Sequence, residues 1–230
     1  MASYVLIHGA YQGSWIWGPT AARLRASGHA VYAPSLDGCG ERRHQLRPGI
    51  TVESHAVEIA ELMFYEDLSD VVLTGTSAGG MVLCRAAELA RERIDRLIFV
   101  DALALMDGER VAEIVNRPTP RVVTAYGVAP SREDAENRSF ADLTPDLRAF
   151  ALTRYTPHPI AALEEPVALK HFWTLPWQAT VIRCRRAANP PEAHQRRTAA
   201  RLGASYREID TGHYPMLSHP EVLAPLLLED

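Results

Sequence analysis

Short apolar runs alternate with longer amphipathic stretches along most of this chain. Six apolar runs have the length and the bounding residues of strands, and they cover 4–8, 30–33, 70–74, 96–101, 179–184 and 205–209. The stretches between them place apolar residues at helical spacing and predict helices at 16–27, 52–66, 78–92, 190–202 and 219–229. Such alternation predicts an α/β fold with a six-stranded, mainly parallel sheet that carries helices on both faces.

This alternation breaks after the fourth predicted strand. Residues 106–177 form a segment that is too long for a plain connection between two elements. We predict that the segment is a helical cap inserted over the strand ends, so that 1–105 and 178–230 make up the core. The sequence shows no internal repeats or low-complexity tracts that would favour another organisation.

The turn between the third predicted strand and its helix carries the most informative motif. Ser77 stands between glycines in Gly75-Thr76-Ser77-Ala78-Gly79. A G-x-S-x-G sequence between a strand and a helix is typical of a nucleophile elbow, in which a sharp turn exposes the serine hydroxyl at the start of the helix. A chance match in a loop is the alternative interpretation.

Two further loops support the first interpretation. The first predicted strand runs into His8-Gly9-Ala10, a loop suited to hold backbone N–H groups against a developing oxyanion. We assign the two donors to Ala10 and Ala78, and a structural role to His8. Near the other end, His213 follows the last predicted strand in a glycine-containing loop, where a histidine can act as general base.

The serine motif precedes the histidine loop in the chain, which is the order found in α/β-hydrolases. The chain resembles that superfamily over nearly its whole length. Within the superfamily, the chain is most similar to the compact branch that contains plant methyl esterases, hydroxynitrile lyases and small bacterial hydrolases. The motif that carries this likeness is His8-Gly9-Ala10-x-x-Gly13-x-Trp15-x-Trp17. The resemblance implies an α/β-hydrolase fold, a serine nucleophile, an oxyanion hole and a catalytic triad.

The acid of that triad departs from the family pattern. The resemblance implies an aspartate after the strand at 179–184, but the segment 185–191 contains no carboxylate. The alternative acid position of the superfamily, after the next strand beyond the nucleophile helix, is occupied by Asp101. Because neighbouring parallel strands end at one edge of the sheet, we expect Asp101 to reach and steady the ring of His213. The alternatives are a capping role for Asp101 and the use of Asp210 as the acid.

Aromatic residues near the predicted site are candidates for the substrate pocket. Tyr11 directly follows Ala10, and Trp173 and Trp177 lie in the predicted cap. We predict that these three bind an apolar or aromatic substrate, although packing of the cap on the core is the alternative for each tryptophan.

Composition and charge exclude several classes of function. The 230 residues are 47% hydrophobic with a net charge of −4, and a single lysine accompanies scattered arginines, so we expect no nucleic-acid partner. Three distant cysteines form no metal-binding pattern, and we expect no metal and no cofactor. We predict a cytoplasmic protein without a membrane span or a signal peptide. The sequence is compatible with a homodimer.

The expected function is therefore hydrolysis of a carboxylic ester, thioester or lactone of small to medium size. Two alternatives remain: a lyase or cyclase of a natural-product pathway on the same scaffold, and a ligand-binding protein without turnover. The hydroxynitrile lyases that the chain resembles have a threonine and a lysine where this sequence has Gly9 and Tyr214. That difference disfavours cleavage of cyanohydrins.

Overall fold

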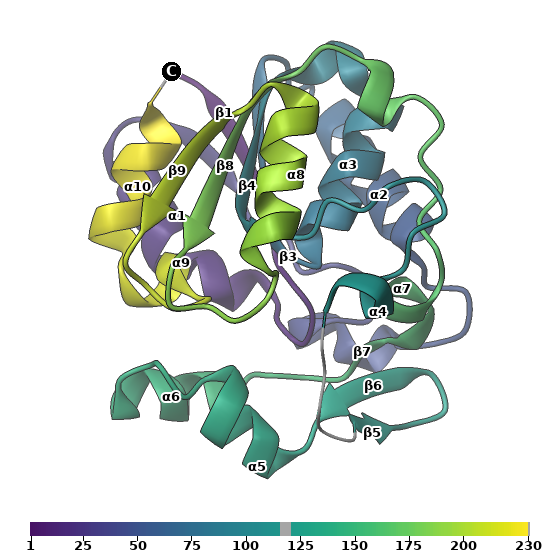
Figure 1. The fold of residues 1–230 in the computed structure, drawn as a ribbon, viewed down its shortest axis with the longest axis vertical. Coiled ribbons are helices and arrows are strands. Elements are labelled where there is room, and N and C mark those ends of the chain that lie inside the picture. Colours follow the sequence, from purple (N-terminus) through teal and green to yellow (C-terminus); the bar gives the residue numbers. More distant parts are fainter. Residues whose placement is uncertain (116–120, 230) are drawn as a thin grey trace.

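A computed structural model describes residues 1–115 and 121–229 of the chain. Its central sheet has six parallel strands in the order β2-β1-β3-β4-β8-β9 (Figure 1). The strands are β1 (Ser3–Ile7), β2 (Ala30–Tyr32), β3 (Val71–Ser77), β4 (Ile94–Ala102), β8 (Gln178–Cys184) and β9 (Ser205–Ile209). All six predicted strands are confirmed, and β3 and β4 extend beyond the predicted runs.

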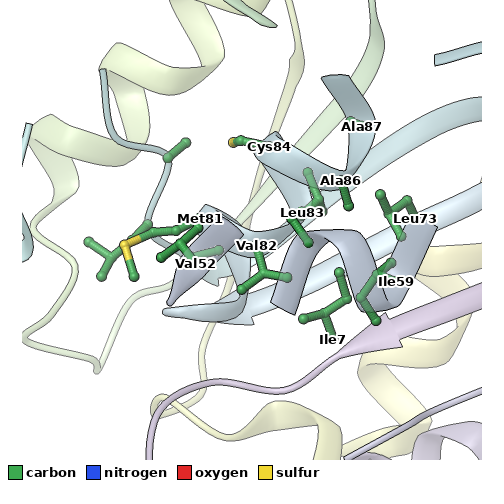
Figure 2. Close-up of a cluster of buried hydrophobic side chains, with 14 of the residues drawn as sticks. Ile7, Val52, Ile59, Leu73, Met81, Val82, Leu83, Cys84, Ala86 and Ala87 are labelled. Atoms are coloured by element: carbon green, nitrogen blue, oxygen red, sulfur yellow. The ribbon is translucent and has the colours of Figure 1, made fainter. Parts of the chain in front are cut away.

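Helices cover both faces of this sheet. The main ones are α1 (Gly18–Ala26), α2 (Val52–Tyr65), α3 (Gly79–Leu89), α8 (Glu192–Leu202), α9 (Pro215–Ser218) and α10 (Pro220–Leu228), with short helices η1 (Ser14–Trp17), η2 (Gly40–Gln45) and η3 (Arg91–Arg93) between them. Successive side chains of a strand point to opposite faces, so the core is divided in two. Figure 2 shows one part, in which Ile7 and Leu73 of the sheet lie near Ile59 of α2 and Val82 of α3.

The part of the insertion from β5 (Arg121–Val123) to β7 (His158–Pro159) lies beyond the carboxyl ends of the strands, and the chain then runs back beside the core to the start of β8 (Figure 1). Between β4 and β8, the insertion contains α4 (Val111–Ile114), β5, β6 (Gly127–Pro130), α5 (Arg132–Asp134), the π-helix η4 (Ala135–Ser139), α6 (Pro145–Leu152), β7, α7 (Ile160–Glu164) and η5 (Phe172–Thr174). The strands β5, β6 and β7 form a small antiparallel sheet. Helices hold more of the described insertion than these strands do, and the small sheet was not predicted, because its strands are too short to show a periodic pattern in the sequence.

The insertion is joined to the core by buried polar contacts as well as by apolar packing. His158 of β7 lies 3.4 Å from the thiol of Cys39, and the amide of Gly40 donates to the hydroxyl of Thr156 at 3.2 Å. Both contacts bring the insertion against the loop that precedes α2. Among the described residues, no helix has the length and apolar character needed to cross a membrane.

Candidate active site

Ser77 is the last residue of β3, and α3 begins two residues later at Gly79. Its backbone has a φ of +52°, in the left-handed region that residues other than glycine rarely adopt. Strained conformations of this kind are concentrated at functional sites, where the surrounding structure enforces them. The sharp turn from strand to helix that the motif predicts is therefore present.

Two glycines let the first loop pack directly against this turn. A side chain at Gly79 would place its Cβ 2.5 Å from the carbonyl oxygen of His8, and one at Gly9 would approach the Cβ of Ser77 to 2.6 Å. Neither position has room for a methyl group. The loop that carries Ala10 consequently lies as close to Ser77 as two backbones allow.

His8 holds this loop from behind and is fully buried. Its Nε2 accepts a hydrogen bond from the amide of Leu36 at 3.0 Å, and its Nδ1 donates to the carbonyl oxygen of Gly9 at 2.8 Å. Because Nε2 faces a backbone donor, the ring is neutral with its proton on Nδ1. Burial lowers the pKa of His8 to about 4. The structural role predicted for this histidine is consistent with these contacts.

Asp101 lies near the carboxyl end of β4 with its side chain fully buried. The pairing of β3 with β4 shifts there, so that Thr76 pairs with Val100 and Ser77 with Ala102. Asp101 is the additional residue of this bulge and has a φ of +47°. Bulges redirect a side chain away from the alternation of its strand.

The redirected carboxylate meets the ring of His213. The Nδ1 of His213 donates to Oδ2 of Asp101 at 2.5 Å, across 112 positions of sequence. Asp210, the other carboxylate considered near this histidine, is exposed and lies 3.5 Å from the guanidinium of Arg185. The histidine is therefore paired with Asp101 and not with Asp210.

Gln195 holds the second oxygen of Asp101, a contact that the sequence analysis missed. This side chain is 1% exposed, and its Nε2 donates to Oδ1 at 2.8 Å, while the amide of Cys184 donates to the same atom at 3.2 Å. Gln195 lies on α8, just after the segment that lacks the expected aspartate. The sequence feature that could have pointed to Gln195 is its place beside two other polar residues, His194 and Thr198, on the buried face of that helix.

Replacing Gln195 with methionine should lower the free energy of unfolding by about 1–3 kcal/mol, because a buried carboxylate then loses one of its donors. Urea unfolding monitored by circular dichroism measures this change. The matched control is Gln178→Met at an exposed position of β8, which should leave stability within about 0.5 kcal/mol of the original. Equal effects of the two substitutions would contradict the assigned contact.

A cavity of about 310 Å³ lies above Ser77. Its described lining residues are Ala10, Tyr11, Gln12, Ser77, Ala78, Leu103, Val115, Arg121, Pro130, Asp134, Arg138, Ser139, Ala188, Asn189, Pro190, His213 and Tyr214. It therefore brings together the predicted nucleophile, the histidine, both residues assigned to the oxyanion and Tyr11. The insertion supplies Arg121, Asp134 and Arg138, whose polar groups the sequence analysis did not connect with the site.

The two tryptophans assigned to substrate binding are corrected by the structure, since neither is among the described residues that line this cavity. Trp177 is buried, stacks on Phe172 with ring centroids 5.4 Å apart and donates to its carbonyl oxygen at 2.8 Å. Trp173 donates to the carbonyl oxygen of Leu105 at 3.1 Å. Trp173 thereby contacts the core at Leu105, and Trp177 contacts it through the guanidinium of Arg91, which lies 4.5 Å from its ring centroid. Both contacts fit the alternative of packing on the core.

Helix α8 also holds the chain that follows Asp101. The Nε2 of His194 accepts from the amide of Ala104 at 3.0 Å, and Arg197 forms two 2.7 Å hydrogen bonds with the carboxylate of Glu109. Burial and the neighbouring guanidinium lower the pKa of His194 to about 4. A single helix thus positions both the buried carboxylate and the start of the insertion.

The buried neutral histidines make stability depend on pH. His8 and His194 have a pKa of about 4 in the folded state and 6.5 in the unfolded chain, so only the unfolded state takes up their protons between these values. Unfolding free energy should therefore fall as pH decreases from 6.5 to 4, by at most about 1.4 kcal/mol per pH unit for each histidine.

Urea unfolding across this pH range is the measurement. His194→Gln keeps an acceptor for Ala104 and should make the decline shallower, whereas His44→Gln at an exposed position should leave it unchanged. A decline of unchanged slope in His194→Gln would contradict the assignment for that residue.

Together these groups form an arrangement suited to acyl transfer. A hydroxyl on a strained turn, an imidazole paired with a buried carboxylate and two candidate backbone donors border one cavity. This combination supports nucleophilic attack, proton transfer and stabilisation of an oxyanion.

Known proteins resemble this chain in sequence and in fold. The sequence model of the "Alpha/beta hydrolase family" matches residues 4–226. The carbendazim hydrolyzing esterase of Nocardioides sp. (strain SG-4G) is 31% identical over 179 residues, 74% of each chain, and methylesterase 3 of Arabidopsis thaliana is 27% identical over 98% of this chain and 94% of its own. An extracellular alpha/beta-hydrolase from a Paenibacillus species has the same fold, with a TM-score of 0.84, 23% identity and coverage of 99% and 98% of the two chains.

Proposed function

The chain belongs to the alpha/beta hydrolase family and is an esterase-like hydrolase, and from this premise we propose that it cleaves carboxylic esters, thioesters or lactones through Ser77, His213 and Asp101. The observation that carries the proposal is the convergence of three distant segments at one edge of the sheet. Ser77 and His213 border the same cavity, and His213 is hydrogen-bonded to the buried carboxylate of Asp101.

In the proposed first step, Oγ of Ser77 attacks the carbonyl carbon while Nε2 of His213 takes its proton. The carboxylate of Asp101 stabilises the resulting imidazolium and keeps Nδ1 protonated throughout. The backbone amides of Ala10 and Ala78 donate to the oxyanion. His213 then gives its proton to the leaving alcohol or thiol, which departs and leaves an acyl group on Ser77.

In the second step, water hydrolyses the acyl group. His213 takes a proton from the water as it attacks, and the collapse of the second tetrahedral intermediate returns that proton to Ser77. The products are a carboxylic acid and the regenerated enzyme, without any external co-reactant.

The cavity supports a small to medium substrate. Its volume of about 310 Å³ is at the lower end of the range typical of small-molecule sites. Apolar side chains such as Leu103, Val115 and Pro130 form much of its lining, which suits an apolar or aromatic acyl or alcohol group. The names of two relatives, a carbendazim hydrolyzing esterase and a methylesterase, favour methyl esters and carbendazim as the first substrates to test.

The deciding experiment combines active-site labelling with turnover. Intact-protein mass after incubation with a fluorophosphonate should show one adduct, and a panel of small activated esters should be hydrolysed over many cycles. Labelling without ester turnover would favour the lyase or cyclase alternative. Neither labelling nor turnover, with ligand-induced changes in melting temperature, would favour a binding protein and overturn the proposal.

A further inference from the structure

Tyr214 is a polar residue of the cavity to which the proposed reaction assigns no role. It directly follows His213 and precedes α9. The side chain is 7% exposed and lies between two other rings, with centroids 5.2 Å from Phe140 and 5.0 Å from His213. These contacts give the phenol one orientation at the wall of the cavity.

Gln12 determines which hydrogen bonds this phenol can make. The amide of Gly9 is 3.0 Å from Gln12, and because a backbone N–H only donates, the atom facing it is the carbonyl oxygen Oε1. The other end of the side chain is therefore Nε2, which also only donates. Gln12 forms a hydrogen bond with Tyr214, so the phenol oxygen accepts it.

The phenol keeps its own hydrogen for a second bond. Burial raises the pKa of Tyr214 well above its usual value, and the nearby carboxylates of Asp142 and Asp101 act in the same direction, so the group is neutral. Within residues 1–115 and 121–229, no hydrogen bond with the Tyr214 hydroxyl as donor is present. Tyr214 is thus a neutral donor at the wall of the cavity.

The position of this donor relates it to the reacting group. Its partner Gln12 is held by Gly9, the neighbour of Ala10 in the proposed oxyanion site, and Tyr214 itself adjoins the proposed base His213. Ala10, His213 and Tyr214 border the same cavity, so a substrate bound there can contact all three. A buried hydrogen-bond donor distinguishes between ligands, because a ligand without an acceptor leaves the donor unpaired and binds less tightly. Aliphatic side chains in a pocket do not distinguish ligands in this way.

We propose that the hydroxyl of Tyr214 donates a hydrogen bond to the substrate, and that the preferred substrates carry an oxygen or nitrogen acceptor next to the reacting carbonyl group. This inference rests on the proposed function. It selects alkoxy- or hydroxy-substituted acyl esters and esters of alkoxy alcohols over purely aliphatic esters of the same size.

Matched substrates test the proposal. p-Nitrophenyl methoxyacetate and p-nitrophenyl butyrate differ by an oxygen in place of a CH₂ on the acyl side, and 2-methoxyethyl acetate and butyl acetate differ in the same way on the alcohol side. Within each pair, the ratio of kcat/KM values is measured for the original protein and for Tyr214→Phe. Comparing the two proteins cancels the difference in intrinsic reactivity of the esters.

A second variant tests the same hydrogen-bond donor without removing the Tyr214 hydroxyl. Gln12→Glu keeps an oxygen for the amide of Gly9 but replaces the donor to Tyr214 with an acceptor, so the phenol hydrogen turns to Glu and away from the substrate. The matched control is Tyr65→Phe, at an exposed tyrosine that ends α2. Thermal unfolding of each variant verifies that it is folded before kinetics are compared.

We expect both Tyr214→Phe and Gln12→Glu to reduce the preference for the oxygen-containing ester by about tenfold in at least one pair, with no change in Tyr65→Phe. Unchanged ratios in both pairs, in variants that remain folded and active, would overturn this inference and leave the proposed function standing. If the original protein hydrolyses none of the four esters, the proposed function itself is overturned, together with the inference that depends on it.

Discussion

Replacing Ser77 with alanine is expected to lower kcat for ester hydrolysis by about 10⁶, to the residual rate that binding and the oxyanion donors support. The methyl side chain cannot form the acyl-enzyme, and His213 then has no hydroxyl to activate. Steady-state hydrolysis of a p-nitrophenyl ester measures the loss, and intact-protein mass after fluorophosphonate treatment shows whether the adduct disappears.

The substitution is informative because it changes few contacts. The backbone of residue 77 has a φ of +52°, which alanine tolerates no better than serine, so any loss of stability should be similar to that of an ordinary surface change. Ser27→Ala, at the exposed end of α1, is the matched control and should retain full activity and labelling. A Ser77→Ala protein that is folded and still labelled would mean that another nucleophile reacts.

Replacing Asp101 with asparagine is expected to lower kcat by about 10⁴ without unfolding the protein. The reason lies in the donors around this side chain. Gln195 and the amide of Cys184 both donate to Oδ1, so asparagine would keep its oxygen toward them and turn its NH₂ group toward His213. Nδ1 of the histidine would then have to accept, its proton would move to Nε2, and the ring could no longer take the proton of Ser77.

The measurement is kcat across the neutral and alkaline pH range, together with the NMR signals of the imidazole nitrogens, which report the tautomer. Asp210→Asn is the matched control, since Asp210 is exposed and pairs with Arg185, and it should leave kcat within a factor of about two. Asp101→Asn with nearly full activity, or Asp210→Asn with the larger loss, would show that the acid has been assigned to the wrong residue.

Local patterns predicted the central sheet well because its inner strands β1, β3 and β4 are almost entirely buried between the helices of the two faces. Runs such as Val71-Val72-Leu73 have no polar residue to expose, and burial of apolar surface makes the largest favourable contribution to folding. The antiparallel sheet of the insertion could not be predicted in this way. Val122 and Val123 of β5 are more than half exposed, and β7 has two residues, so neither strand has a pattern that sequence periodicity could detect.

The two tryptophans of the insertion show that sequence alone does not predict the direction in which a side chain points. Trp173 and Trp177 were assigned to the pocket because they are aromatic and lie in the insertion, yet Trp173 donates to the backbone of Leu105 and Trp177 packs against Phe172 and Arg91. Composition identifies which residues can line a pocket, but the direction of a side chain depends on the path of the backbone around it. Gln12, Gln195 and Tyr214 were missed for the same reason.

By itself, the sequence determined the α/β architecture, the turn at Ser77 and the loop that carries His213, because these depend on neighbouring residues: apolar runs, glycines beside a serine, and a glycine-containing loop after a strand. Only the tertiary structure decided that Asp101 is turned toward His213, through a bulge in β4 and a donor from α8 that lies 94 positions away in the chain. Local conformational preferences are encoded by a few adjacent residues. The orientation of a buried carboxylate is decided by groups from distant segments, because the cost of burying it must be offset by every donor that folding brings to it.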